Sequence, residues 1–268
     1  MNKGSKLYKC FSFVYQLLIG KWKYGFYPFM LKYFFLIRRR EILELKKLGF
    51  DNLRIYKTDS WRIGVENDHA YRRYYLAKFN GRECFVKIAQ NDSTVNNEIY
   101  VADRIKGYKM SFTPEVIYTS TEFLDNRNLL VLEFIDGLRP LSEALSKDNT
   151  SAFCNQFLLI LNTLKAINLI HADIHKGNLM LDKDNNLILL DFGISIFKDE
   201  KNNVDYKSHP GTYYQEKDCI RIYDDAFSFV QMIRQLHVHD YIKDDEAYNE
   251  IYNRIGNFYA DINMNDYK

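Results

Sequence analysis

The residues best suited to chemistry lie in two short runs of the chain, His171-x-Asp173-x4-Asn178 and Asp191-Phe192-Gly193. Asp173 and Asp191 are 18 positions apart, and the apolar pieces between them predict two short strands that fold back on each other. Such a hairpin brings both carboxylates and the Asn178 amide to one end. Magnesium prefers oxygen ligands in a near-octahedral array and accepts a few protein oxygens beside phosphate oxygens. Asn178 and Asp191 can supply these oxygens, which leaves Asp173 to orient and deprotonate a hydroxyl.

The elements around these runs divide the chain into a β-rich first part and a helix-rich second part. Residues 71–89 predict two strands joined by Asn80-Gly81, the strongest short signal for a hairpin. Two more strands are predicted at 115–121 and 128–135. Apolar residues at helical spacing predict four helices, at about 94–106, 151–168, 224–237 and 246–262. A sheet with one helix therefore precedes a group of helices.

The two runs resemble the catalytic loop and metal site of the protein-kinase-like phosphotransferase superfamily, in which H-x-D-x4-N precedes D-F-G. The resemblance covers about residues 55–235 and is strongest at the catalytic loop. It implies a two-lobed fold that binds ATP and Mg²⁺ between the lobes. It also implies that His171 and Gly193 support the site structurally. YDDAFSFVQMI resembles the helix whose aspartate, here Asp225, holds the backbone of the catalytic loop.

Other parts of the family pattern follow in the same order along the chain. The run CFVK, ending at Lys87, is similar to the family's strand-three lysine motif, which implies that Lys87 neutralises the α- and β-phosphates. Glu98, on the helix that follows, would be the carboxylate that holds this lysine. LVLEFIDG resembles the strand that leads into the hinge. By position, Leu132 would be the gatekeeper, and the backbones of Glu133 and Ile135 would meet the adenine edge.

The chain departs from the family pattern at three places. The glycine positions of the phosphate-covering loop hold Asn67, His69 and Arg72, so either Arg72 and Arg73 supply cationic side chains instead or the ATP site is degenerate. Phe85 stands where the family has a small alanine, and it is expected to crowd the base. The A-P-E motif that closes the activation segment of a protein kinase is missing, and HPGTYYQEKD stands there.

The catalytic loop itself is closer to those of small-molecule phosphotransferases. Protein serine kinases usually have lysine two residues after the catalytic aspartate, and His175 occupies that position here. The run from His175 through Lys176 to Asn178 resembles that of the bacterial lipopolysaccharide core heptose kinases, which work at the cytoplasmic face of the inner membrane. This resemblance implies a sugar hydroxyl of a surface glycolipid as acceptor. His175 or Lys176 would offset charge on the transferring phosphoryl group.

Charge is spread unevenly along the chain. The formal net charge is +2, but residues 1–50 hold eight Lys, three Arg and two Glu, a net of +9, so residues 51–268 carry −7. This basic arm also holds 13 of the 42 aromatic residues. It suits the interface of an anionic membrane, or it forms ordinary helices that pack on the main domain. The net-negative remainder would repel a long polyanion, so nucleic acid is not an expected partner.

Length, composition and cysteine usage suit one domain with two lobes, or two small domains, in a reducing compartment. The 268 residues are 47% apolar and 27% charged, which excludes disordered and fibrous classes. Four separated cysteines with no C-x-x-C pair argue against zinc ribbons and disulfides. No cleavable signal peptide and no spanning helix is evident. A cytoplasmic location is expected, either free or peripheral at the inner membrane.

These observations predict an α+β, bilobal, protein-kinase-like fold with an arm over residues 1–50. The β-rich N-lobe is expected at 51–135 and the helical C-lobe at 136–268. The predicted function is ATP- and Mg²⁺-dependent phosphate transfer to a hydroxyl, with a glycolipid sugar as the first candidate acceptor. A Ser/Thr protein kinase is the second hypothesis, because a long segment follows Asp191. A non-catalytic pseudokinase is the third, because of the glycine-poor loop.

Overall fold

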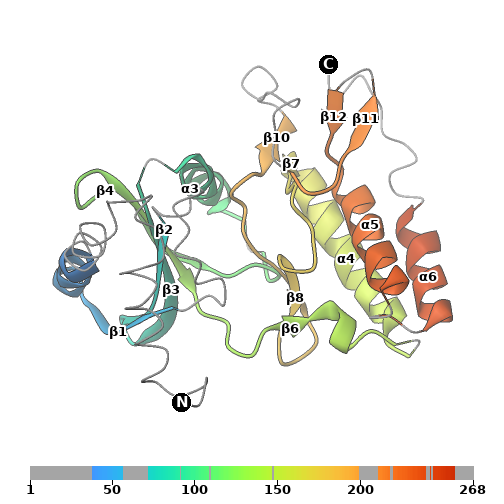
Figure 1. Cartoon of the computed structure of the whole chain (residues 1–268), viewed down its shortest axis with the longest axis horizontal. Coiled ribbons are helices and arrows are strands. Elements are labelled where there is room, and N and C mark those ends of the chain that lie inside the picture. Colours follow the sequence, from blue (N-terminus) through green and yellow to red (C-terminus); the bar gives the residue numbers. More distant parts are fainter. Residues whose placement is uncertain are drawn as a thin grey trace, which may run out of the picture.

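A computed structural model gives the fold (Figure 1) and describes residues 38–56, 72–90, 92–108, 110–146, 148–198, 211–217, 220–239, 242 and 244–256. After a helix over residues 38–47, a sheet with one helix, α3 (Ser93–Ile105), comes first and a group of helices follows, as predicted. Most of the basic arm and the loop positions Asn67 and His69 lie outside the described residues. The predicted lobe boundaries at residues 50 and 135 stay predictions.

Five antiparallel strands form the sheet of the first lobe, in the order β1-β2-β3-β5-β4. Their bounds are β1 Phe50–Ile55, β2 Arg72–Phe79, β3 Arg82–Ala89, β4 Val116–Phe123 and β5 Arg127–Glu133. Asn80 and Gly81 join β2 to β3 with positive φ angles of 51° and 80°. Two such residues in succession are what a two-residue type I′ hairpin requires, so the predicted hairpin is confirmed.

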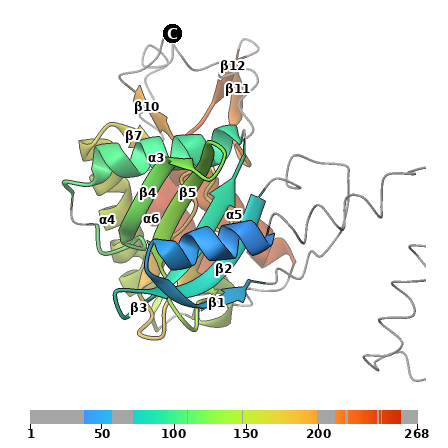
Figure 2. The same cartoon turned by 90° about the vertical axis from the view of Figure 1, so that its left-hand side faces the viewer.

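Two helices cover opposite faces of this sheet. Alternate residues of β5 point to opposite faces. Leu130 packs in a cluster with Val95 and Ile99 of α3 (Ser93–Ile105), whereas Leu129 packs in a cluster with Leu45. Leu45 belongs to the helix over residues 38–47, which crosses in front of the sheet in Figure 2. Asp92 caps α3 by accepting hydrogen bonds from the first free N–H groups of the helix.

A buried carboxylate ties the helix over residues 38–47 to the sheet. Glu41 is fully buried, and it accepts hydrogen bonds from Arg73 Nε at 2.5 Å, Tyr75 Oη at 2.6 Å and Arg127 Nη1 at 2.6 Å. Removing one partner of a buried ion pair is strongly destabilising because the other charge is left without compensation. Residues 38–47 of the arm therefore pack on the main domain, which is one of the two alternatives predicted for the arm.

Three helices form the centre of the second lobe and lie side by side in Figure 1, α4 (Thr150–Ala166), α5 (Asp225–Val238) and α6 (Asp245–Gly256). Phe157 of α4 stacks on Phe229 of α5, with ring centroids 3.6 Å apart. Short paired elements lie against them: β6 (Arg139–Pro140), η3 (Leu141–Glu143), β7 (Leu169–Ile170), β8 (Leu179–Leu181), β9 (Leu187–Leu189) and β10 (Ile196–Phe197). The apolar core of this lobe fixes the loops that carry the candidate site.

One region differs from the sequence-based expectation. No strand is predicted between residues 199 and 222, but strand β11 (Gln215–Lys217) pairs there with β12 (Ile220–Ile222) in an antiparallel hairpin just before α5. β11 is the polar run Gln-Glu-Lys, and each strand has only three residues, which is too short to show the alternation on which a strand prediction depends.

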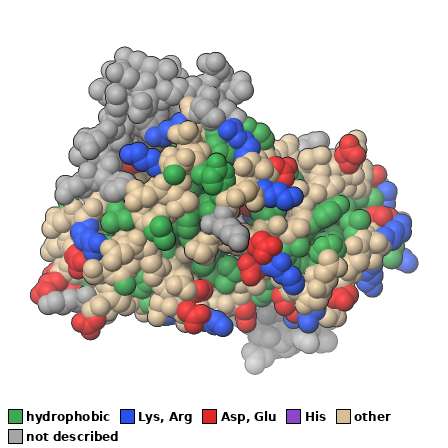
Figure 3. Space-filling view, turned by 180° about the vertical axis from the view of Figure 1, so that it is seen from behind, with side chains coloured by type: hydrophobic (Ala, Val, Ile, Leu, Met, Phe, Trp, Pro, Cys, Tyr) green, Lys and Arg blue, Asp and Glu red, His purple; other side chains and the backbone are tan. Residues whose placement is uncertain are grey.

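Surface charge contributes little to the stability of this fold. Basic and acidic side chains are interspersed over the described part of the face shown in Figure 3. Pairs such as Arg82–Glu115, with 2.7 Å between Nη2 and Oε2, are exposed, so solvent screens them. Among the described helices, none has the length and apolar character needed to cross a bilayer.

Candidate active site

A cavity of about 420 Å³ lies between the sheet of the first lobe and the β8–β9 hairpin of the second. This volume is in the range of ligand sites that bury most of a small molecule. Six of the predicted site residues line it, namely Lys87, Glu98, Glu133, Ile135, Asn178 and Asp191. The other six predicted residues, Asp173 among them, do not line the cavity but lie in or against the segments that carry Asn178 and Asp191. The structure thus brings together residues that span more than a hundred positions of sequence.

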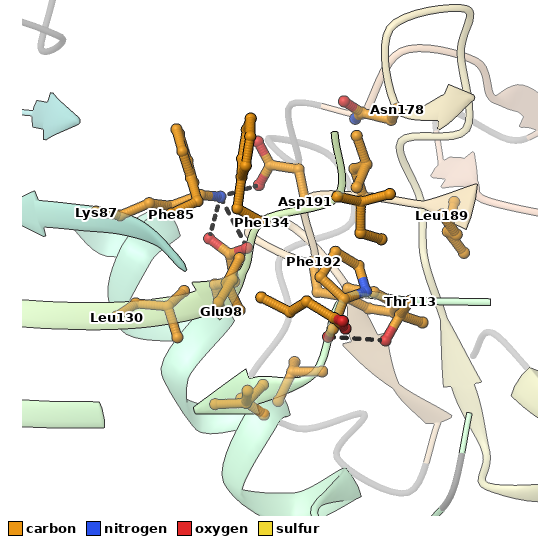
Figure 4. A pocket seen from close by; sticks show the side chains of 18 of the residues that line it. Phe85, Lys87, Glu98, Thr113, Leu130, Phe134, Asn178, Leu189, Asp191 and Phe192 are labelled. Carbon is orange, nitrogen blue, oxygen red and sulfur yellow. Dashed lines mark hydrogen bonds and ion pairs between the residues drawn. The ribbon is translucent and has the colours of Figure 1, made fainter. Parts of the chain in front are cut away.

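Lys87 extends from β3 into this cavity, where two carboxylates face it (Figure 4). Its Nζ donates to both carboxylate oxygens of Glu98, at 2.8 and 2.7 Å, and Asp191 Oδ1 lies 3.8 Å away. Burial lowers the pKa of the Lys87 ammonium, but the charges of Glu98 and Asp191 outweigh burial and hold it above its ordinary value. The ammonium therefore stays charged and suits an anionic ligand such as a phosphate group.

The catalytic-loop candidate Asp173 is held from both sides. Asn178 Nδ2 donates to the backbone oxygen and to Oδ2 of Asp173, both at 3.0 Å. His175 Nε2 lies 3.5 Å from Oδ2, while the His175 Nδ1 accepts the Gly177 N–H at 2.9 Å. The Thr212 hydroxyl donates to Oδ1. Burial raises the pKa of Asp173, but hydrogen bonds from His175 and Thr212 together hold it below its ordinary value, so the carboxylate is ionised at neutral pH.

A second aspartate holds the backbone that precedes Asp173. Asp225, the first residue of α5, accepts the N–H of His171 at 2.8 Å and that of Ala172 at 3.0 Å. Ala172 has a φ of 66°, which costs a non-glycine residue free energy unless its surroundings enforce it. Burial lowers the pKa of His171 to about 4, so the ring is neutral, and its Nε2 donates to Leu190 O at 3.0 Å. This network joins the loop to the strand that leads into Asp191.

Asp191 and Asn178 offer oxygen atoms that could bind a magnesium ion. Asp191 has a φ of 62° and its side chain is about half exposed to the cavity. The side-chain nitrogen of Asn178 donates to Asp173, so the Oδ1 atom of Asn178 is left to act as a metal ligand. Among the described residues, no group of three or more His, Cys, Asp or Glu side chains could enclose a metal ion by itself. Two protein oxygens completed by phosphate oxygens and water are the arrangement magnesium commonly adopts.

The hinge between the lobes presents backbone groups to the cavity. The N–H of Glu133 donates to Glu115 O at 2.8 Å, and that of Phe134 donates to Glu83 O at 3.2 Å. No such bond from the Ile135 N–H is found within the described part of the chain. Ile135 therefore offers a donor at the rim of the cavity beside the carbonyl of Glu133, and this pair can meet the edge of a purine base.

Three aromatic rings form the roof of the cavity. Phe85 stacks on Tyr74 with centroids 5.6 Å apart and meets Tyr56 edge-on at 5.2 Å. Phe85 was expected to crowd the base, and the structure places it among the residues that line an open cavity. Arg72 begins β2, and its side chain lies outside the described set. An aromatic roof can stack on any nucleobase.

Sequence reasoning missed some residues that the geometry brings into the site. Asn97 contacts the backbone of the segment that follows Asp191, and a single asparagine next to Glu98 carries no pattern that could have revealed it. Thr212 lies in the run HPGTYYQEKD, to which no role is assigned from the sequence, and its hydroxyl donates to Asp173 Oδ1. Ser195 is buried, and its hydroxyl donates to His171 O at 3.1 Å. Lys176 is exposed in the catalytic loop.

The two-lobed arrangement and this site define an α+β fold of the protein-kinase-like class. A strand lysine paired with a helix carboxylate faces an aspartate–asparagine loop across one cavity. The profile of a family described as the ABC1 atypical kinase-like domain matches residues 94–218. This segment is just under half of the chain and includes Glu98, the catalytic loop and Asp191, but not Lys87.

Curated relatives carry kinase names at low identity. Serine/threonine-protein kinase 10 of Danio rerio is 28% identical over 167 residues, which are 58% of this chain and 17% of that protein. Aurora kinase of Encephalitozoon cuniculi is 28% identical over 100 residues, 35% of this chain and 37% of that protein. The chain thus spans well under half the length of these relatives. Fold, family profile and relatives together support the protein-kinase-like superfamily.

Proposed function

We propose that the chain transfers the γ-phosphoryl group of ATP to a hydroxyl. The observation that carries this proposal is the Lys87 ammonium, which lies 2.7 Å from Glu98 and 3.8 Å from Asp191 in a cavity that Asn178 also lines, while Asn178 donates to the Asp173 carboxylate. A binding module has no physical need for an ionised base next to a cavity that holds a buried ammonium. Phosphoryl transfer needs both, because its catalysis is mostly positioning and electrostatic stabilisation.

Nucleotide binding follows from the residues that line the cavity. The base lies beneath Phe85, with its edge toward the Glu133 carbonyl and the Ile135 N–H. Lys87 contacts the α- and β-phosphates, and Glu98 keeps that ammonium in place. Asn178 and Asp191 hold magnesium, which when bound neutralises charge on the phosphate oxygens.

The transfer step is assigned to Asp173. The acceptor oxygen attacks the γ-phosphorus, the bond to the β–γ bridging oxygen breaks, ADP leaves, and the acceptor proton passes to the Asp173 carboxylate. Oδ2 is occupied by Asn178 and His175, so Oδ1 is the oxygen that faces the acceptor. The Thr212 hydroxyl at Oδ1 marks where an acceptor hydroxyl would sit. His175 and Lys176 offset charge on the transferring group.

The acceptor we favour is a sugar hydroxyl of a bacterial surface glycolipid, as for lipopolysaccharide core kinases. The support is the run from His175 to Asn178 and the β11–β12 hairpin that stands where protein kinases have A-P-E. On this proposal the protein works in the cytoplasm at the inner face of the membrane, and the basic arm provides contact with anionic lipid.

A protein Ser or Thr hydroxyl is the second candidate acceptor. Its support is Thr212, a polypeptide hydroxyl that already donates to Asp173, together with the serine/threonine-kinase names of the relatives.

The test offers γ-labelled ATP and Mg²⁺ with glycolipid-containing envelope extract and with soluble protein as separate acceptors, each beside an Asp173→Asn control. Label in the glycolipid fraction that the control lacks supports the favoured acceptor. Label only on protein supports the second. No label anywhere, together with no ATP-dependent thermal shift, would contradict phosphotransferase function and leave a non-catalytic binding module.

A further inference from the structure

One face of α3 contacts the segment that carries the proposed metal ligand Asp191. Asn97, Tyr100 and Arg104 are spaced i, i+3 and i+7, so they share one side of the helix. All three touch residues between Phe192 and Phe197. Glu98, one position after Asn97, points instead to Lys87. The same turn of α3 therefore contacts the Lys87 ammonium through Glu98 and the segment after Asp191 through Asn97.

The Asn97 amide is surrounded by backbone oxygens of that segment. Its Nδ2 lies 2.9 Å from Ser195 O, 3.2 Å from Gly193 O and 3.5 Å from Phe192 O. Because all three neighbours are carbonyl oxygens, only the donor end of the amide fits there. Its two hydrogens can bind Ser195 O and Gly193 O at once. One side chain therefore holds together two carbonyl groups of the turn that follows Asp191.

Close packing accompanies these hydrogen bonds. A Cβ built on Gly193 would lie 3.1 Å from Thr94 Cβ and 3.2 Å from Thr94 O. The first turn of α3 therefore approaches the Gly193 backbone too closely for a side chain without movement. Asp191 Oδ1 accepts the Gly193 N–H at 3.3 Å, so the position of this glycine also influences the orientation of the carboxylate.

The far end of the segment is fixed to the same helix. Phe197 is 4% exposed, its ring lies 3.9 Å from the Arg104 guanidinium, and Tyr100 meets it edge-on at 6.1 Å. Ile196 and Phe197 also pair with Ile170 and Leu169 of β7, directly before the catalytic loop. The segment thus connects α3 to that loop.

We infer that Asn97 is a positioning residue, which sets the metal-binding segment relative to the Lys87–Glu98 pair. This inference rests on the proposed phosphotransferase function. If α3 rotated, the Asn97 bonds and the Glu98 contact would break together, so the two halves of the nucleotide site are assembled as one unit. A neutral amide performs this coupling.

The test compares Asn97→Ala and Asn97→Asp with Asn96→Ala. Asn96 is the neighbouring asparagine of α3, and its side chain faces Asn128 rather than the site, so it is a matched control. Asn97→Asp keeps the shape but replaces the donor by a carboxylate against three carbonyl oxygens. Each full-length variant is assayed for ATP turnover against Mg²⁺ concentration, and amide hydrogen exchange of residues 192–197 is measured without nucleotide.

Loss of two hydrogen bonds should raise the Mg²⁺ concentration for half-maximal activity roughly tenfold in Asn97→Ala, and more in Asn97→Asp. Exchange of residues 192–197 should accelerate in both variants and stay unchanged in Asn96→Ala. Equal Mg²⁺ dependence and equal exchange in all three would overturn the inference. If the wild-type chain shows no ATP turnover, the proposed function fails, and the exchange measurement still decides whether Asn97 holds the segment.

Discussion

The ion pair between Lys87 and Glu98 allows a quantitative test of the candidate site. The proposed perturbation is a double-mutant cycle with Lys87→Met and Glu98→Gln, singly and together. Both side chains are largely buried, with 11% and 6% exposed, and both carboxylate oxygens lie within 2.8 Å of Nζ. Either single substitution removes the ion pair and leaves the remaining charge in the cavity wall less well compensated.

The expected magnitude follows from this burial. Breaking a buried pair by removing one partner costs about 3 kcal/mol of unfolding free energy. Glu98→Gln should cost less than Lys87→Met, because Asp191 remains 3.8 Å from the ammonium. The double variant removes both charges, so its cost should fall short of the sum by about 2 kcal/mol.

The assay is urea unfolding of the four proteins at pH 7. The exposed pair Arg82–Glu115 provides a matched cycle with Arg82→Met and Glu115→Gln. Its coupling should lie within experimental error, since solvent screens it. Additive costs at Lys87 and Glu98 would refute the reasoning, because additivity means that the two groups do not interact in solution.

Three further substitutions test other parts of the site. Phe85→Ala should weaken ATP binding about fivefold in calorimetry, because a ring that stacks on the base is lost; tighter binding would mean that Phe85 crowds the base. Gly211→Ala should destabilise the fold by about 2 kcal/mol in urea unfolding, because the new Cβ would lie 2.1 Å from Tyr223 Cε1 and 2.6 Å from Ala172 O; wild-type stability would contradict that packing. Burial raises the pKa of Asp225 to about 7, so the folded protein holds this proton more tightly than the unfolded chain. Its contribution to stability should be full below about pH 4 and be lost as the pH rises through 7. The wild type should therefore lose stability relative to Asp225→Asn over this range, and parallel melting curves would exclude the shift.

Local sequence patterns were sufficient for most of the fold. The Asn80-Gly81 turn, the capped helix α3 and the helices α4 and α5 each carry a short-range signal, and the observed bounds lie within about two residues of the predicted ones. The proximity of Asp173, Asn178 and Asp191 also followed from a local hairpin, since Leu179 pairs with Leu189. Because one hairpin fixes the sequence spacing of these residues, their relative positions can be predicted from the sequence.

Contacts between distant segments could not be predicted in this way. Glu41 reads as one acidic residue in a basic arm, yet it binds Arg73 and Arg127, which lie 32 and 86 positions away. Asn97 reaches carbonyl oxygens almost a hundred positions further along. Both depend on which faces of two elements meet, and a single sequence does not encode that in any periodic pattern.

In the proposed mechanism, Asp173 deprotonates an acceptor hydroxyl next to a cavity that binds ATP and Mg²⁺. The most direct measurement follows ATP binding and γ-phosphate transfer in the wild type and in Asp173→Asn under single-turnover conditions. We predict equal ATP affinity in both proteins and at least a hundredfold slower transfer in the variant, the order of magnitude expected for loss of a general base. Undiminished transfer by Asp173→Asn would contradict the account.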